Sequence, residues 1–186
     1  MNLIVSAPSG SGKTTILSKI FEMFPDVFGF SVSATTRQPR KGEKHGKDYY
    51  FISVEEFNRN IEQNAFLEFE QVYEGLFYGT LKSEIERINS SGKRAVFDVD
   101  VKGGINIKQS LGNQAYSVFI MPPDLLTLER RLKQRNTETE DSLNKRLMRA
   151  EMEISYADKF DQIIINGDLD VAVSEFADIV HKHILK

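Results

Sequence analysis

The chain has 186 residues, of which 40% are hydrophobic and 27% charged, and its formal net charge is −3. This composition suits one globular domain and gives no overall basic field that would attract a nucleic acid or an anionic membrane. Because the chain has no cysteine, disulfides, thiolate catalysis and cysteine-bound metals are excluded. No apolar run approaches the ~20 residues of a membrane span. We therefore expect a cytoplasmic protein without signal peptide or membrane helix.

The first strong pattern is a loop at residues 7–14, Ala-Pro-Ser-Gly-Ser-Gly-Lys-Thr, between a predicted strand and a predicted helix. The strand is the apolar run at residues 2–6, and the helix follows because apolar residues at 16, 17, 20 and 21 share one helix face. A strand, a glycine-rich loop ending in Gly-Lys-Thr and a helix form the context that a phosphate-binding P-loop requires. The alternative is a Gly/Ser-rich turn that happens to hold a lysine.

Each residue type in this loop has a role in holding phosphate. Gly10 and Gly12 leave backbone N–H groups free to surround an anion at the positive end of the following helix. Lys13 adds a full charge for the outer phosphates, and the Thr14 hydroxyl can bind Mg²⁺. The usual motif begins with glycine where this chain has Ala7, which fits if its φ is negative. We predict that the nucleotide contacts Ala7, Pro8, Ser9, Gly10, Ser11, Gly12, Lys13, Thr14 and Thr15.

The middle of the chain interrupts the alternation of strands and helices, which then resumes near residue 80. After the first helix the sequence predicts a strand at 28–33. The interrupted part, from about residue 33 to 79, is then predicted to hold a polar and basic surface loop at 34–48, a strand at 49–52 and a helix capped by Ser53 and reaching about residue 64. A strand at 66–72, a turn at 73–76 and a continuation at 77–79 follow. Beyond this part we expect a helix at 81–88 that stops near Gly92, a strand at 95–98, a helix at 103–111 and a strand at 116–121. A helix capped by Asp124 follows, and then a capping box at 137–140 before a long helix that carries on one face Leu143, Leu147, Ala150, Ile154 and Ala157. The last predicted elements are a strand at 162–165 and a helix at 171–185.

Strands that alternate with helices predict an α/β fold with a parallel sheet flanked by helices. The core is expected at residues 1–32, 81–123 and 158–186, with an inserted subdomain at 33–80 and a helical lid region at 124–157. Ligands of such folds bind at the carboxyl ends of the strands, where the P-loop is expected to lie.

Acidic residues lie at and just beyond the end of the predicted strand at 95–98. Asp98 and Asp100 would face the P-loop across the sheet, and Asp98 could hold Mg²⁺ directly or through water. The alternative is a solvated pair of acids at a strand end.

Arginines are dense between residues 130 and 149. Arg131 and Arg135 share one helix face, and Arg146 and Arg149 share another. The plain interpretation is a solvated charged surface. The functional interpretation is a lid that closes arginines on a phosphate chain, and we favour it for Arg135 and Arg146 over Arg131 and Arg149.

Residues 35–51, Thr-Thr-Arg-Gln-Pro-Arg-Lys-Gly-Glu-Lys-His-Gly-Lys-Asp-Tyr-Tyr-Phe, resemble the signature of guanylate kinases at every specified position. The resemblance continues through the P-loop, Glu68, the Tyr-Gly-Thr at 78–80, the acids at 98–100 and the arginine-rich segment, in the family's order. It implies a P-loop kinase core in which the inserted subdomain binds GMP. The implied reaction is ATP plus GMP to ADP plus GDP, in purine nucleotide metabolism, with Mg²⁺ accompanying ATP.

The resemblance also implies roles for single residues. The implied catalytic residues are Lys13, Arg37, Arg135 and Arg146. Implied GMP contacts are Arg37, Arg40, Tyr49 and Tyr78 at the phosphate, with Ser33, Glu68, Thr80, Asp98 and Asp100 at or near guanine. Arg131 and Asn166 would contribute to the ATP site, and Thr14 and Asp98 would bind the metal.

The chemistry of guanine agrees with one of these roles independently. Its N1–H and 2-amino groups can both donate to a carboxylate such as Glu68, and a hydroxyl such as Thr80 can donate to O6. Adenine presents an acceptor at N1 and would leave the carboxylate unpaired. The alternative is that Glu68 faces solvent, as Glu70 would in the same strand phase.

Other interpretations remain open at this point. One is a kinase for a different nucleoside monophosphate or for a phosphorylated sugar, which the 35–51 pattern disfavours. A second is a guanylate-kinase-like protein-binding module, which tends to lose P-loop or lid residues, whereas Lys13 and Thr14 are present. A third is a P-loop hydrolase switch, which would have no need of an acceptor subdomain. The sequence also leaves open whether dGMP is accepted and which oligomeric state the protein has.

Overall fold

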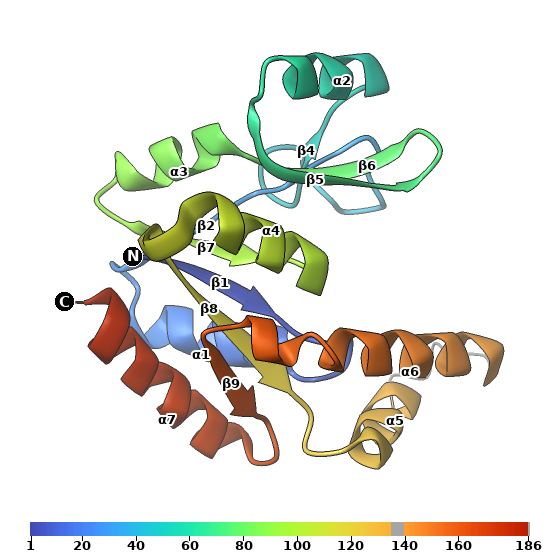
Figure 1. Ribbon diagram of the computed structural model, residues 1–186, viewed down its shortest axis with the longest axis vertical. Helices are drawn as coiled ribbons and strands as arrows, with labels where there is room; N and C mark the ends of the chain where they lie inside the picture. The colour runs from blue at the N-terminus through green and yellow to red at the C-terminus, as the bar shows by residue number, and fades with distance from the viewer. Residues whose placement is uncertain (135–139, 186) are drawn as a thin grey trace.

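The computed structural model describes residues 1–134 and 140–185, which form an α/β molecule with two sheets (Figure 1). The larger sheet has the strand order β2-β7-β1-β8-β9, and all its neighbouring strands are parallel. Its strands are β1 (Asn2–Ser6), β2 (Phe28–Phe30), β7 (Arg94–Asp98), β8 (Ala115–Met121) and β9 (Gln162–Ile165). The predicted parallel sheet is confirmed.

Helices cover both faces of this sheet because successive side chains of a buried strand point in opposite directions. In β1, Leu3 and Val5 pack in one hydrophobic cluster, whereas Ile4 packs in another on the opposite face. The first cluster includes α1 (Lys13–Met23) and α7 (Leu169–Ile179), and the second includes α3 (Lys82–Asn89) and α4 (Val101–Leu111). This arrangement fixes the sheet's carboxyl edge, to which β1 brings the P-loop.

The smaller sheet, of strand order β4-β3-β6-β5, lies beyond α3 and α4 (Figure 1). Its strands are β3 (Ala34–Thr35), β4 (Tyr50–Phe51), β5 (Phe66–Tyr73) and β6 (Leu76–Leu81), and α2 (Val54–Glu62) covers it. The ring of Phe57 in α2 stacks on Phe66 at 4.4 Å and on Phe77 at 5.0 Å between centroids. These aromatic contacts give this part of the chain a hydrophobic cluster of its own.

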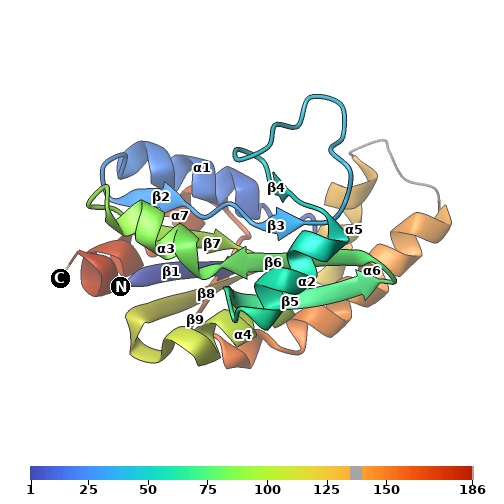
Figure 2. The ribbon, with the colours of Figure 1, turned by 90° about the horizontal axis from the view of Figure 1, so that it is seen from above.

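Two predicted boundaries in this region are wrong. The strand expected at 28–33 ends at Phe30, and the loop expected at 34–48 contains β3. The reason is that the chain leaves one sheet and joins the other within a few residues, a change of partner that a local pattern does not show. Figure 2 shows the remaining connection from β3 to β4 projecting away from the core.

The helices α5 (Leu125–Lys133) and α6 (Glu140–Ile154) pack together through Leu128, Leu132, Leu143 and Ala150. The Asp124 carboxylate accepts from the N–H of Thr127 at 2.6 Å, which confirms the predicted cap. The long helix was expected to include Ala157, and this is wrong. The helix stops at Ile154, and Ala157 begins a 3-10 turn (Ala157–Lys159) that packs with Phe119 against the core. Arg135 and most of the predicted capping box, residues 137–139, lie outside the described residues.

Two more element starts differ from the sequence prediction. Helix α4 begins at Val101, not 103, because the Asp100 side chain caps it by accepting from the N–H of Gly103 at 2.9 Å. Helix α7 begins at Leu169 behind the cap residue Asp168 and passes into a π-helical turn, Val180–Ile184. Among the helices of the described ranges, none has the length and apolar character needed to cross a bilayer.

Candidate active site

A cleft of about 590 Å³ opens at the carboxyl ends of the core strands, between the P-loop, the inserted segment and α6. Its size falls within the range of small-molecule sites. Segments far apart in the sequence meet here because parallel strands all end at one edge of the sheet. The predicted site residues that line the cleft are Ala7, Pro8, Ser9, Gly10, Gly12, Lys13, Thr14, Thr15, Ser33, Tyr49, Asp98, Asp100 and Arg146.

The P-loop has the backbone conformation that its glycines allow. Gly10 and Gly12 have φ values of 91° and 92°, whereas the φ of Ala7 is not positive, so alanine is tolerated at that position. The Lys13 ammonium forms an ion pair with Asp98 and also donates to the carbonyl oxygen of Val99 at 3.3 Å. The cation is therefore already held at the mouth of the loop by the acid that ends β7.

Asn166 lies behind the P-loop rather than on the cleft surface. Its side-chain amide donates to the carbonyl oxygen of Ser11 at 2.7 Å, and a Cβ on Gly12 would come within 2.3 Å of that amide nitrogen. Arg131 in turn donates to the carbonyl oxygen of Asn166 at 2.9 Å. Within the described residues, the Asn166 side-chain oxygen, the Ser11 hydroxyl and one Arg131 nitrogen are buried without a hydrogen-bond partner. Asn166 thus connects Arg131 to Ser11 of the loop, and all three are among the predicted ATP contacts.

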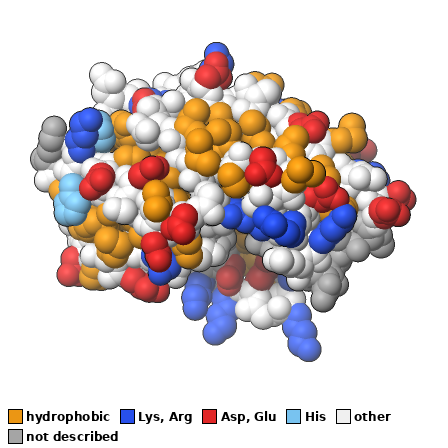
Figure 3. Space-filling view, turned by 90° about the horizontal axis from the view of Figure 1, so that it is seen from below, with side chains coloured by type: hydrophobic (Ala, Val, Ile, Leu, Met, Phe, Trp, Pro, Cys, Tyr) orange, Lys and Arg blue, Asp and Glu red, His pale blue; other side chains and the backbone are white. Residues whose placement is uncertain are grey.

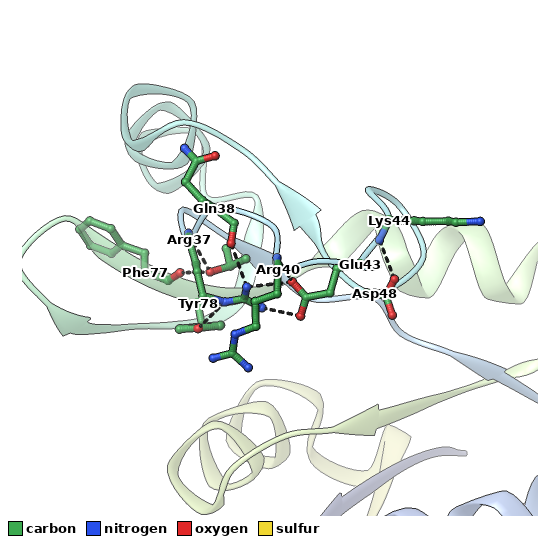
Figure 4. Close-up of polar contacts among 9 residues, drawn as sticks. Arg37, Gln38, Arg40, Glu43, Lys44, Asp48, Phe77 and Tyr78 are labelled. Carbon is green, nitrogen blue, oxygen red and sulfur yellow. Dashed lines mark hydrogen bonds and ion pairs between the residues drawn. The ribbon is translucent and has the colours of Figure 1, made fainter. Parts of the chain in front are cut away.

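Arg37 is held in a polar cluster between β3 and β4 (Figure 4). Its guanidinium donates to both oxygens of Glu43, at 2.8 and 2.9 Å, and to the Tyr78 hydroxyl at 3.2 Å. It also lies over the ring of Tyr49, 5.3 Å from the centroid. The Arg40 N–H donates to Glu43 at 2.6 Å, while the Arg40 side chain is exposed. The structure therefore groups all four of the residues predicted to bind the acceptor phosphate.

Glu43 was not among the predicted site residues, although it is the acid of the 35–51 pattern. Hydrogen bonds from Arg37 and then from the N–H of Arg40 lower its pKa to about 2. The same pair raises the pKa of Arg37. A carboxylate that remains charged and accepts hydrogen bonds from two guanidinium nitrogens fixes the orientation of the arginine side chain. The fixed acid in the motif was the signal that could have identified this role.

Glu68 and Thr80 face each other on neighbouring strands β5 and β6. The Thr80 hydroxyl donates to the Glu68 carboxylate at 2.7 Å, and Thr80 is buried. Burial raises the pKa of Glu68 to about 7 against the effect of the Thr80 hydrogen bond, and the charges of Asp100 and Glu70 raise it further. Glu68 is therefore half-buried and directed at a hydroxyl, so the solvent-facing alternative does not describe it.

On the lid side of the cleft, Arg149 connects two acids. Its guanidinium contacts Glu153 at 2.8 Å and Asp100 at 3.6 Å. Glu153 is buried and also lines the cleft, and burial raises its pKa despite the neighbouring arginine. Glu153 was not among the residues predicted from the sequence, although its position four residues after Arg149, on the same helix face, was an available signal.

Thr14 and Asp98 offer a hydroxyl and a carboxylate oxygen in the same cleft. Both are hard oxygen donors of the kind that Mg²⁺ prefers. Among the described residues there is no group of three or more His, Cys, Asp or Glu that could hold a metal ion. The donor set fits an ion that takes its other ligands from nucleotide phosphates and water.

A P-loop and a polar inserted segment that line one cleft, with the arginine-bearing helix α6 beside them, define a phosphotransferase that acts on nucleotides. The family model of guanylate kinases matches residues 1–183. The chain belongs to the guanylate kinase family.

Individual relatives agree with this assignment. The chain is 49% identical over 170 residues to a guanylate kinase of Bacteroides fragilis, covering 91% of this chain and 83% of that protein. It is 44% identical to a guanylate kinase of Porphyromonas gingivalis, with 99% and 98% of the two chains covered. The crystal structure of guanylate kinase from Anaplasma phagocytophilum is similar with a TM-score of 0.73 at 30% identity, covering 100% of this chain and 87% of that one.

Proposed function

We propose that this chain transfers the γ-phosphoryl group of ATP to GMP, giving ADP and GDP. The observation that carries the choice of acceptor is the Glu68–Thr80 pair, a carboxylate and a hydroxyl 2.7 Å apart in the segment opposite the P-loop. Glu68 accepts from the N1–H and the 2-amino group of guanine, and Thr80 turns its hydroxyl toward O6. Asp100 borders the space beside Glu68, because a Cβ on Gly103 would approach both Asp100 and Glu68 within 3.4 Å. Ser33 and Asp98, which line the cleft, complete the GMP side of the site.

The acceptor phosphate binds at the Arg37 cluster. Hydrogen bonds to Glu43 and Tyr78 orient the Arg37 guanidinium before the phosphate binds. Because Glu43 neutralises much of the Arg37 charge, Arg40 supplies the additional positive charge that a phosphate dianion needs. The Tyr49 ring, 5.9 Å from that of Tyr78, completes this side of the pocket.

The donor nucleotide binds on the P-loop. Lys13 contacts its outer phosphates, and Thr14 and Asp98 hold Mg²⁺, which neutralises phosphate charge when bound. Asn166 contacts the adenine, and Arg131 contributes to the ATP site from the lid region. The lid arginines, Arg135 and Arg146, complete the neutralisation of the phosphate chain, so that residues 124–157 act as the lid, 33–80 as the GMP-binding subdomain and the rest as the core.

The reaction needs no general base because a phosphate oxygen of GMP is already an anionic nucleophile. It attacks the γ-phosphorus of ATP, and the bond from that phosphorus to the β-phosphate oxygen breaks, so that ADP leaves. The protein brings two polyanions together in line and shields their charges, and positioning and charge neutralisation account for the rate.

The experiment that tests this proposal measures ADP formation from MgATP with GMP, dGMP, AMP, CMP, UMP and a ribose phosphate as separate acceptors. We expect fast turnover with GMP and slow turnover with AMP, CMP, UMP and the sugar. Rapid turnover with one of these other acceptors would contradict the base-recognition argument. No turnover with any acceptor, from folded protein, would favour a binding module instead.

The raised pKa of Glu68 predicts a pH dependence of GMP binding. Above pH 7 the side chain is a carboxylate and accepts both guanine donors, whereas below about pH 7 it is neutral and its own proton opposes N1–H. The KM for GMP should therefore rise as the pH falls below 7, with a slope that approaches about tenfold per pH unit. Measurement of KM between pH 8 and pH 5.5 checks this. Glu68→Gln should retain only the shallower dependence from the GMP phosphate itself, and equal slopes in the two proteins would contradict the assignment.

Other properties of the protein follow the same proposal. Acidic and basic side chains are interspersed on the face shown in Figure 3. With a formal net charge of −3, the chain has no overall basic field that would favour a nucleic acid or an anionic membrane as partner. The cysteine-free sequence suits work in a reducing compartment such as the cytoplasm.

A further inference from the structure

The core and the smaller sheet are joined by two stretches of chain, and both meet at Glu84. The outgoing stretch, residues 31–33, connects β2 to β3. The returning stretch is the junction at which β6 ends at Leu81 and α3 starts at Lys82. Glu84 lies in the first turn of α3 and, although charged, is only 2% exposed. A buried carboxylate at such a junction requires several donors to stay ionised.

The backbone of the outgoing stretch changes partners residue by residue. The N–H of Ser31 still donates to Val96 of the core sheet at 3.0 Å, while the carbonyl oxygen of Ser33 already accepts from the N–H of Tyr50 in the smaller sheet at 2.9 Å. The N–H of Val32, between them, donates to the Glu84 carboxylate at 2.7 Å. Glu84 thus provides the hydrogen-bond partner at the point where neither sheet does.

The same carboxylate is bonded from both sides of the junction. The Tyr50 hydroxyl, from β4, donates to it at 2.9 Å. Arg87, from α3, donates to it through two nitrogens at 2.7 and 2.8 Å and also reaches the carbonyl oxygen of Phe30 at 3.0 Å. Burial would raise the pKa of Glu84, but the hydrogen bonds from Arg87, Val32 and Tyr50 outweigh it and lower the pKa. The group is therefore a charged, fully bonded connection between the core and the smaller sheet.

Two of the residues held by this connection are neighbours of cleft residues. Ser33 follows Val32, and Tyr49 precedes Tyr50; both Ser33 and Tyr49 line the cleft. We propose that Glu84 is a positioning residue for the acceptor nucleotide. By holding Val32 and Tyr50, it keeps their chain neighbours Ser33 and Tyr49 at the positions where they face GMP. This inference rests on the proposed acceptor site and adds to it a residue that contacts no substrate.

A carboxylate that only stabilised the fold would give a different result from one that positions the acceptor site. Loss of stability alone lowers the melting temperature and leaves the KM values of the folded protein unchanged. Loss of positioning raises the KM for GMP and spares the KM for MgATP. The P-loop lies between β1 and α1, and in the described part of the chain residues 7–15 form no hydrogen bond or ion pair with Glu84 or its bonding partners. The ratio of the two KM values is therefore the informative measurement.

The experiment measures kcat, KM for GMP and KM for MgATP in Glu84→Ala, Glu84→Gln and Tyr50→Phe, together with each melting temperature. Glu84→Ala is expected to raise KM for GMP about tenfold or more, since several bonds to a charged group are lost, with KM for MgATP within about twofold. Glu84→Gln keeps one carbonyl oxygen as acceptor and should lie between Glu84→Ala and the unmodified enzyme. Tyr50→Phe removes a single hydroxyl and should raise KM for GMP about threefold.

Controls separate this inference from the proposed function. The unmodified enzyme is assayed first with the acceptor panel, so failure of the acceptor assignment appears there and not in the variants. Glu86→Ala, an exposed acid on the same helix, should change neither KM. An equal rise of both KM values, or an unchanged KM for GMP in folded variants, would overturn the inference. If Glu84→Ala does not fold, Tyr50→Phe decides, because an unchanged KM in that variant would overturn it as well.

Discussion

Replacing Lys13 by methionine is expected to leave the fold intact and to lower kcat by roughly 10³-fold. Methionine keeps the unbranched stem of the side chain and removes only the cation. The Lys13 and Asp98 side chains are 20% and 26% exposed, so the unpaired acid that remains can be hydrated and the protein should still fold. The loss in rate follows because no other P-loop side chain supplies a full positive charge for the outer phosphates. The measurement is ADP release at saturating MgATP and GMP.

Lys182→Met is the matched control for this variant. Lys182 is an exposed lysine in the C-terminal turn and does not line the cleft. Its substitution should leave kcat within about twofold of the unmodified value. Turnover of Lys13→Met within tenfold of the unmodified enzyme, at a similar melting temperature, would contradict charge neutralisation by this lysine.

The second large effect is expected for Glu68→Ala, in which kcat/KM for GMP should fall by about 10³-fold. Two guanine donors lose a charged acceptor, whereas AMP loses only a carboxylate that its N1 acceptor leaves unpaired, so the preference for GMP over AMP should collapse. The variant should fold well at pH 8. Burial raises the pKa of Glu68 to about 7 from its ordinary value of 4.5. The unfolded chain therefore loses this proton at lower pH than the folded protein does, and the contribution of Glu68 to stability falls as the pH rises from 4.5 through 7. Its removal at pH 8 is therefore not destabilising on this account.

Glu70→Ala provides the comparison for Glu68→Ala. Glu70 lies two residues further along β5, on the same side of the strand, opposite Tyr78 and 3.8 Å from Lys102. Because it does not contact Thr80, its removal should change kcat/KM for GMP by no more than about threefold. A Glu68→Ala enzyme that still prefers GMP strongly, or equal effects of the two substitutions, would remove Glu68 from base recognition.

The elements that the sequence predicted best are those whose signal is local. The P-loop was predictable because a buried strand, positive-φ glycines and the start of a helix are adjacent in the chain, and Gly10 and Gly12 have that conformation. The caps by Ser53 and Asp124 were predictable for the same reason, since each side chain bonds an N–H three residues ahead. The predicted end of the long helix failed at Ala157 because packing against Phe119, far away in sequence, ends the helical path earlier.

The site shows the same division. The 35–51 pattern indicated Arg37 as a phosphate-binding residue, but the sequence could not show that Glu43 and Tyr78 accept hydrogen bonds from its guanidinium. Asn166 was assigned to the ATP site by resemblance, and only the structure shows its amide bonded to the Ser11 carbonyl oxygen.

The sequence by itself determined the class of chemistry: a phosphate loop, oxygen donors for a hard metal ion, and a polar segment rich in arginine and tyrosine. Tertiary structure decided which of these groups act on one another. The choice between a solvated and a half-buried Glu68 depended on the pairing of β5 with β6, and the partners of Glu84 depended on where the two sheets join. Residue type fixes what a side chain can donate or accept, but burial and partner distance fix its charge and orientation, and these arise only when strands distant in sequence come together.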